Sequence, residues 1–178
     1  PEFYPAYPSL AARGMIVALA HVRGGQELGR AWYDDGHLMK KRNSFTDFID
    51  VTRALVGEGY AAKGRVAGFG RSAGGLLMGA VLNMAPEDYG TIITQVPFVD
   101  AVTTMLDPTI PLTTNEYDEW GNTEQQPAHD YILSYSPYDN VRARPYPPVY
   151  VSTGLWDSQV QYYEPAKWVA RLRRLKTD

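Results

Sequence analysis

The sequence of 178 residues contains no cysteine, which excludes disulfide bonds, thiolate catalysis and cysteine-rich metal sites. It has no apolar run approaching the ~18 residues of a membrane-spanning helix, and its first residues lack the basic-then-apolar pattern of a secretion signal. Its net charge of −3 gives no electrostatic reason to bind nucleic acid or an anionic membrane. We therefore expect no nucleic acid, membrane, metal or cofactor. The lack of cysteine is compatible with a reducing compartment.

The remaining composition is typical of a globular protein. Hydrophobic residues make up 44% and charged residues 21% of the chain, and 178 residues are enough for one domain with a real core. The amino terminus reads Pro1-Glu-Phe-Tyr-Pro5 and has no initiator methionine. We therefore expect residues 1–178 to be a central part of a longer protein.

Strand-like and helix-like apolar patterns alternate along the chain. They predict strands at 15–22, 65–69, 91–96 and 149–153, and helices at 44–57, 73–84 and 164–175. This alternation predicts an α/β fold with a doubly wound, mostly parallel sheet and helices on both faces. Functional residues in such sheets lie beyond the carboxyl ends of the strands.

The sequence Gly70-x-Ser72-x-Gly74 lies between a predicted strand and a predicted helix. This context is typical of a nucleophile elbow, a sharp turn that holds a serine in strained backbone geometry. We expect a side chain at either glycine to collide within so tight a turn. The N–H of Ala73 would then be placed to stabilise an oxyanion. The alternative is an ordinary glycine-rich turn that binds phosphate, although the phosphate-binding loop patterns are absent.

A nucleophilic serine needs an acid and a base, which in α/β-hydrolases follow it in the order acid, then histidine. Asp157 comes directly after the last predicted strand and is the candidate acid. Its alternative role is that of a helix N-cap.

No histidine follows Asp157, and the chain has three histidines in all. We expect His21 to be packed in a core strand, His37 to be solvated in a polar loop, and His129 to lie in a short helical patch. His129 could act as base only in an unusual order, so the plainer interpretation places the base outside this chain.

A second cluster, Glu116-Tyr-Asp118-Glu119-Trp120, places carboxylates beside aromatic residues. Such a combination suits a pocket for arginine or lysine, since carboxylates bind the charged head and apolar walls bind the stem. The alternative is a solvated acidic loop, which is the usual role of such runs.

Four segments, read in order, resemble the prolyl oligopeptidase family and within it the basic-residue-specific oligopeptidase B branch. They are the elbow segment GFGRSAGGLL at 68–77, HVRGGQELGRAW at 21–32, SYSPYDNV at 134–141 and WDSQV at 156–160. The resemblance implies a cytosolic serine peptidase that cleaves short peptides after Arg or Lys by an acyl-enzyme mechanism. It further implies an α/β-hydrolase domain capped by a β-propeller.

The resemblance also implies roles for individual residues. Ser72 would be the nucleophile, Asp157 the triad acid and the Ala73 N–H one oxyanion donor. The substrate-binding residues would be Glu116, Phe98 as an aromatic wall, and Asp118 as a less certain second acid. The triad histidine would lie beyond Asp178 and the oxyanion tyrosine before Pro1, because neither Tyr4 nor Tyr7 has the glycine-flanked context of that tyrosine.

The sequence is therefore expected to form a partial α/β-hydrolase catalytic domain over residues 1–178, incomplete at both ends and inactive by itself. Two other functions remain open. A carboxylesterase uses the same triad on the same fold, but it has no need of an acidic pocket. A non-catalytic α/β scaffold would explain the missing histidine.

Overall fold

The computed structural model describes residues 4–178, and its core element is a sheet of three parallel strands. The strands are β1 (Val66–Arg71), β2 (Tyr89–Gln95) and β3 (Val149–Ser152) in the spatial order β1-β2-β3. The three predicted strands in this part of the chain are thus confirmed, with small shifts at their ends. All three strands end at the same edge of the sheet, where the loops that follow them meet.

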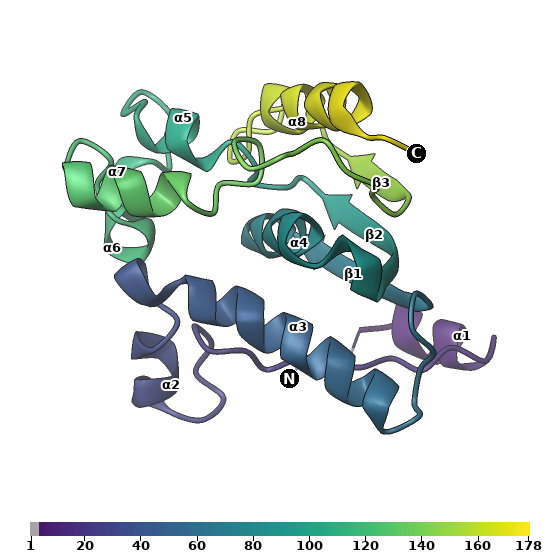
Figure 1. The fold of residues 1–178 in the computed structure, drawn as a ribbon. Helices are drawn as coiled ribbons and strands as arrows, with labels where there is room; N and C mark the ends of the chain where they lie inside the picture. The colour runs from purple at the N-terminus through teal and green to yellow at the C-terminus, as the bar shows by residue number, and fades with distance from the viewer. Residues whose placement is uncertain (1–3) are drawn as a thin grey trace.

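Helices flank the sheet and fill the connections between its strands (Figure 1). The long helices are α3 (Arg42–Gly57), α4 (Ala73–Met84) and α8 (Tyr163–Leu175), so all three predicted helices are present. The shorter elements are α1 (Ala6–Ala11), α2 (Arg30–Asp34), η1 (Leu38–Lys40), η2 (Pro86–Asp88), α5 (Ala101–Met105), η3 (Thr114–Glu116), α6 (Tyr117–Trp120) and α7 (Gln126–Leu133). No helix within residues 4–178 is both long and apolar enough to cross a membrane.

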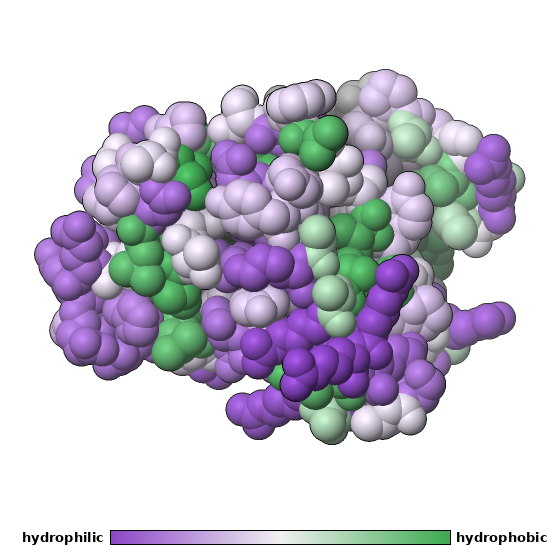
Figure 2. All heavy atoms as spheres, turned by 90° about the horizontal axis from the view of Figure 1, so that it is seen from above, coloured by the Kyte–Doolittle hydropathy of each residue, from purple (hydrophilic) through white to green (hydrophobic). Residues whose placement is uncertain are grey.

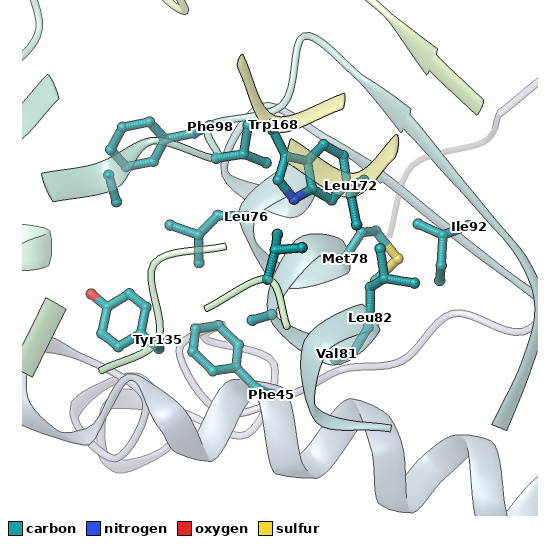
Figure 3. Close-up of a cluster of buried hydrophobic side chains, with 14 of the residues drawn as sticks. Phe45, Leu76, Met78, Val81, Leu82, Ile92, Phe98, Tyr135, Trp168 and Leu172 are labelled. Atoms are coloured by element: carbon teal, nitrogen blue, oxygen red, sulfur yellow. The ribbon is translucent and has the colours of Figure 1, made fainter. Parts of the chain in front are cut away.

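One face of the sheet carries a continuous hydrophobic core. Ile92 of β2 is fully buried, and its neighbours across the sheet are Gly68 and Val149. The helices α3, α4 and α8 contribute side chains to this core, with Trp168 of α8 close to Met78 of α4 (Figure 3). Burial of apolar area on this scale is the main stabilising term of the fold.

The opposite face of the sheet is open in the described residues. Phe69, Ile93 and Tyr150 form a row across the three strands, and Phe69 and Tyr150 are 48% and 61% exposed. The α/β class of the prediction is confirmed, but the second layer of helices that it included is not found within residues 4–178. Seen from above the view of Figure 1, the surface of the chain also mixes strongly hydrophilic residues with hydrophobic patches (Figure 2).

The predicted strand at 15–22 is wrong, because this segment forms no strand in the structure. Met15 and Ile16 are exposed, and a groove of about 560 Å³ separates residues 14–20 from the segment that enters β1. A strand is stabilised by its ladder of backbone hydrogen bonds to a neighbour. Among the described residues this segment has no such neighbour, so its β-branched composition is not sufficient.

Candidate active site

Ser72 lies between the last residue of β1 and the first residue of α4, at the carboxyl edge of the sheet. Its φ is 54° and its ψ is −118°, a conformation that a residue other than glycine rarely adopts. The N–H of Ser72 donates to the carbonyl of Gln95 (3.0 Å), and the Ser72 carbonyl accepts from the N–H of Phe98 (3.1 Å). The predicted strand–elbow–helix geometry is therefore present, and the neighbouring strand holds it in place.

The glycines around Ser72 have different roles from those expected. A Cβ at Gly70 would lie 2.1 Å from the carbonyl oxygen of Gly74, so glycine is required there. A Cβ at Gly74 would meet nothing within 4 Å, so the expectation of a clash at this position is wrong. Gly75 is instead the crowded position on the helix side, where a Cβ would lie 2.4 Å from the Cβ of Pro97. The reason is that the turn brings α4 against the loop that follows β2.

Ala73 is the first residue of α4, and the first N–H groups of a helix have no acceptor within the helix. They also lie at the positive end of the helix dipole. The Ala73 N–H is thus placed where an oxyanion formed next to the Ser72 hydroxyl could accept a hydrogen bond.

A small cavity opens directly beside Ser72. It has a volume of about 80 Å³, which is room for several water molecules. The lining residues come from the elbow, the loop after β2, the long segment between β2 and β3, and the turn after β3. They are Ser72, Ala73, Phe98, Thr104, Met105, Ile110, Leu112, Thr113, Glu116, Trp120, Gln159 and Val160. The structure therefore brings together four of the predicted site residues, Ser72, Ala73, Phe98 and Glu116.

Glu116 supplies a carboxylate to an otherwise mostly apolar cavity. One of its oxygens, Oε2, accepts a hydrogen bond of 2.7 Å from the indole Nε1 of Trp120. The Phe98 and Trp120 rings lie 5.4 Å apart and form part of the same lining. A carboxylate within aromatic and aliphatic walls matches the two halves of an arginine or lysine side chain.

These features agree with a comparison against known families. The family described as the prolyl oligopeptidase family, Peptidase_S9, matches residues 1–178. The chain belongs to this family.

Several members of the prolyl oligopeptidase family are similar to the chain over nearly all of its length. Dipeptidyl aminopeptidase BI of Pseudoxanthomonas mexicana is 71% identical over 177 residues, which are 99% of this chain and 24% of the relative. Oligopeptidase B from Leishmania major is 54% identical with a TM-score of 0.97, over 100% of this chain and 25% of that one. Oligopeptidase B from Trypanosoma brucei with covalently bound antipain is 53% identical with a TM-score of 0.86, over 89% and 22%. The chain thus spans about a quarter of the length of these relatives.

Asp157 lies in the turn after β3, where the sequence pattern predicts the triad acid. Its Oδ1 accepts hydrogen bonds from the backbone N–H groups of Gln159 (2.9 Å) and Val160 (3.0 Å), both of which line the cavity. The carboxylate therefore shapes the turn in the manner of a cap, although α8 begins only at Tyr163. Asp157 itself does not line the cavity.

Asp118, the second predicted acid, is exposed and does not line the cavity. Its backbone carbonyl accepts a hydrogen bond from His37 Nε2. The acidic cluster therefore divides, with Glu116 inside the cavity and Asp118 outside it.

None of the three histidines lines the cavity. The expectation of a packed His21 is wrong, because His21 is exposed and lies 3.4 Å from a carboxylate oxygen of Glu27. The expectation of a solvated His37 is also wrong, because His37 is only partly exposed and its Nε2 binds the Asp118 carbonyl in the segment between β2 and β3. His129 lies in α7 as predicted, and its nearest carboxylate is that of Asp130.

Two buried acids beside the cavity could not be recognised from the sequence. Glu164 of α8 accepts hydrogen bonds from the N–H groups of Val99 and Asp100 (3.0 Å each) and from the Thr104 hydroxyl (2.6 Å). Burial raises the pKa of Glu164 to about 7. Asp100 is also fully buried and forms an ion pair with Lys167. These contacts fasten the loop that carries Phe98 to α8, and apolar periodicity contains no signal for them.

Within residues 4–178, no group of three or more His, Asp or Glu side chains is arranged to hold a metal ion.

Proposed function

We propose that this chain is the central part of the catalytic domain of a serine oligopeptidase that hydrolyses short peptides after Arg or Lys. In this proposal Ser72 is the nucleophile that forms the acyl-enzyme, and the Ala73 N–H is one oxyanion donor. Asp157 is the triad acid. Glu116 binds the basic side chain on the acyl side of the scissile bond.

The observation that carries this proposal is the position of Glu116. Its carboxylate lines the same small cavity as Ser72, and the surrounding walls include Phe98 and Trp120. A substrate side chain that fills the cavity would displace water from around the carboxylate. The attraction between carboxylate and guanidinium then operates at a lower effective dielectric than in water.

Other parts of the proposal lie outside residues 1–178. The general base would be a histidine, and the second oxyanion donor a tyrosine hydroxyl, from the remainder of a longer protein. A β-propeller would restrict access to short peptides, and the protein would be cytoplasmic. The relatives are about four times as long as this chain, which leaves room for these parts.

The proposal is tested in the complete protein by the substitution Glu116→Gln. For peptide substrates with Arg before the scissile bond, this variant should have a lower kcat/KM than the wild type. The activation free energy should rise by roughly 2–5 kcal/mol, since one partner of a desolvated charge pair is lost. Its kcat/KM for small neutral acyl esters should change little. Ser72→Ala should abolish both activities. Glu124→Gln is the matched control, because Glu124 is exposed and lies outside the cavity.

Other outcomes would contradict the proposal in different ways. Equal losses on both substrate classes would make Glu116 a structural residue. No loss on either class, together with good ester turnover, would favour a carboxylesterase. Absence of any Ser72-dependent hydrolysis would favour a non-catalytic scaffold.

A further inference from the structure

The carboxylate of Glu116 is held by a hydrogen bond from a neighbouring residue. The indole N–H of Trp120 donates to Glu116 Oε2 at 2.7 Å, and Trp120 is only 6% exposed. A hydrogen bond to an ionised acceptor is about twice as strong as one between neutral groups. Among the described residues, no donor binds the other oxygen, Oε1, which keeps its acceptor sites for a ligand.

The Trp120 ring is itself fixed by two different contacts. The Phe98 ring lies 5.4 Å from it, and the Lys41 ammonium lies 4.6 Å from its centroid. Lys41 is 7% exposed, so this cation–π contact is formed largely out of water, where it is strongest. A cation over the ring also polarises the indole so that its N–H becomes a better donor.

The buried charge of Lys41 is balanced by Glu119, which belongs to α6 as Trp120 does. Lys41 Nζ donates to Glu119 Oε1 at 2.5 Å, and the Tyr33 hydroxyl donates to Glu119 Oε2 at 2.9 Å. His37 binds the Asp118 carbonyl one residue earlier. Residues 33–41 therefore hold α6 by side-chain contacts with three successive residues, 118–120. In Figure 1, α6 lies beside the start of α3, which follows η1 and Lys41.

This arrangement matters for binding because Glu116 ends η3 on the cavity wall and its side chain has three rotatable bonds. Fixing such a side chain before the ligand arrives removes most of the entropy cost of ordering it on binding. An unrestrained carboxylate could instead turn toward water. The contacts of α6 are thus a means of keeping the charge of Glu116 aimed within the cavity.

We propose that Trp120, supported by Lys41, is a positioning residue that fixes the Glu116 carboxylate for a cationic substrate side chain and so sets the preference for basic residues. This inference rests on the proposed function of the site. It assigns the selectivity to a hydrogen bond made within the protein, in addition to the charge of Glu116 itself.

The test uses the complete protein and a pair of peptide substrates that differ only in arginine or citrulline before the scissile bond. Citrulline has nearly the shape of arginine but no charge, so changes in the apolar wall affect both substrates. For Trp120→Phe, kcat/KM for the arginine substrate should fall on the order of tenfold, and that for the citrulline substrate by less than about twofold. Trp32→Phe is the matched control, because the Trp32 N–H donates to the His21 carbonyl instead. It should leave the arginine-to-citrulline ratio unchanged.

Two further variants keep the test decisive if Trp120→Phe does not fold. Replacing Trp120 with benzothienylalanine substitutes sulfur for the N–H and retains the bicyclic ring, and the arginine-to-citrulline ratio should fall as it does for phenylalanine. Lys41→Met retains an aliphatic stem but removes the cation, and should lower the ratio roughly threefold.

The outcomes separate this inference from the proposed function. A wild-type protein that hydrolyses the two substrates equally well would contradict both. A wild-type preference for arginine that Glu116→Gln removes, but that Trp120→Phe and the benzothienylalanine variant retain, would overturn the role of Trp120 alone. Equal losses of kcat/KM on both substrates in the Trp120 variants would show that Trp120 contributes only to the apolar lining of the cavity.

Discussion

At the scale of single residues, two of the three described non-glycine residues with a positive φ lie at one edge of the sheet, and the third is Leu38 of η1. Ser72 and Val96 have φ values of 54° and 41°, and each directly follows a strand, β1 and β2 respectively. The last paired residues of these strands, Arg71 and Gln95, are register partners. Two neighbouring strands therefore leave the sheet through strained turns side by side, where Phe98 reaches back to bind the Ser72 carbonyl. Strain that is concentrated in this way is typical of functional sites.

The first prediction concerns the two motif glycines, which the structure shows to be unequal. Gly70→Ala should lower the free energy of unfolding by about 3 kcal/mol, because its Cβ would overlap the Gly74 carbonyl. Gly74→Ala should raise it by about 0.5–1 kcal/mol, because the position is helical, its φ is not positive and the site is open. Urea denaturation of dilute protein measures both. Equal destabilisation by the two substitutions would contradict the geometry of the turn.

A second prediction concerns Glu164, whose pKa burial raises from an ordinary 4.5 to about 7. The native state then binds more protons than the unfolded state between these two pH values. This carboxyl group therefore lowers the free energy of unfolding as pH rises from about 4.5 to about 7, by on the order of 3 kcal/mol. Chemical denaturation across this range should show the decrease as a difference between the wild type and Glu164→Gln.

The control for Glu164 is Asp107→Asn, because the Thr109 hydroxyl and N–H hold the pKa of this partly exposed carboxyl below its ordinary value. Any contribution from Asp107 therefore appears at lower pH, and the difference between wild type and Asp107→Asn should stay flat from pH 4.5 to 7. A difference that is equally flat for Glu164→Gln would mean that Glu164 is not held in its neutral form.

At the scale of elements, the sequence predicts those helices and strands that are determined by residues close together in the chain. β1 and α4 are recognisable because an apolar run, a glycine-rich turn and a second apolar run follow one another directly. The segment 15–22 has an equally good strand composition, but pairing depends on a neighbour that composition does not reveal. The contact of Lys41 with Glu119 spans 78 positions, and that of Val99 with Glu164 spans 65. The position of Ser72 and Ala73 at a strand-to-helix turn was therefore predictable, whereas the distant contacts around Glu116 and Phe98 were not.

The third prediction follows from the unpaired segment. In the 178-residue chain, backbone amides of residues 15–22 should exchange with solvent rapidly, whereas those of β2, which is paired on both sides, should be protected. Hydrogen exchange followed by mass spectrometry distinguishes the two segments. Protection of residues 15–22 comparable to that of β2 would contradict the described structure of this segment.

At the scale of the whole molecule, the described residues cover the sheet on one side only. The row formed by Phe69, Ile93 and Tyr150 crosses all three strands, and Phe69 and Tyr150 are largely exposed. A contiguous exposed apolar surface of this kind marks a site of contact. β1 also has one free edge, since only β2 pairs with it among the described residues.

The last prediction is that the 178-residue chain self-associates through this open face. When two such faces meet, each Å² of apolar area removed from water stabilises the complex by roughly 25 cal/mol. The fraction of associated chains should therefore rise with protein concentration. Sedimentation velocity should show larger species, and the double substitution Phe69→Thr and Tyr150→Thr should shift the chain toward monomer while retaining β-propensity. Leu28→Thr is the control, because Leu28 is 70% exposed in a loop away from the sheet. If the wild-type chain stays monomeric over the whole concentration range, or if Leu28→Thr has the same effect as the double substitution, the open face is not the surface responsible.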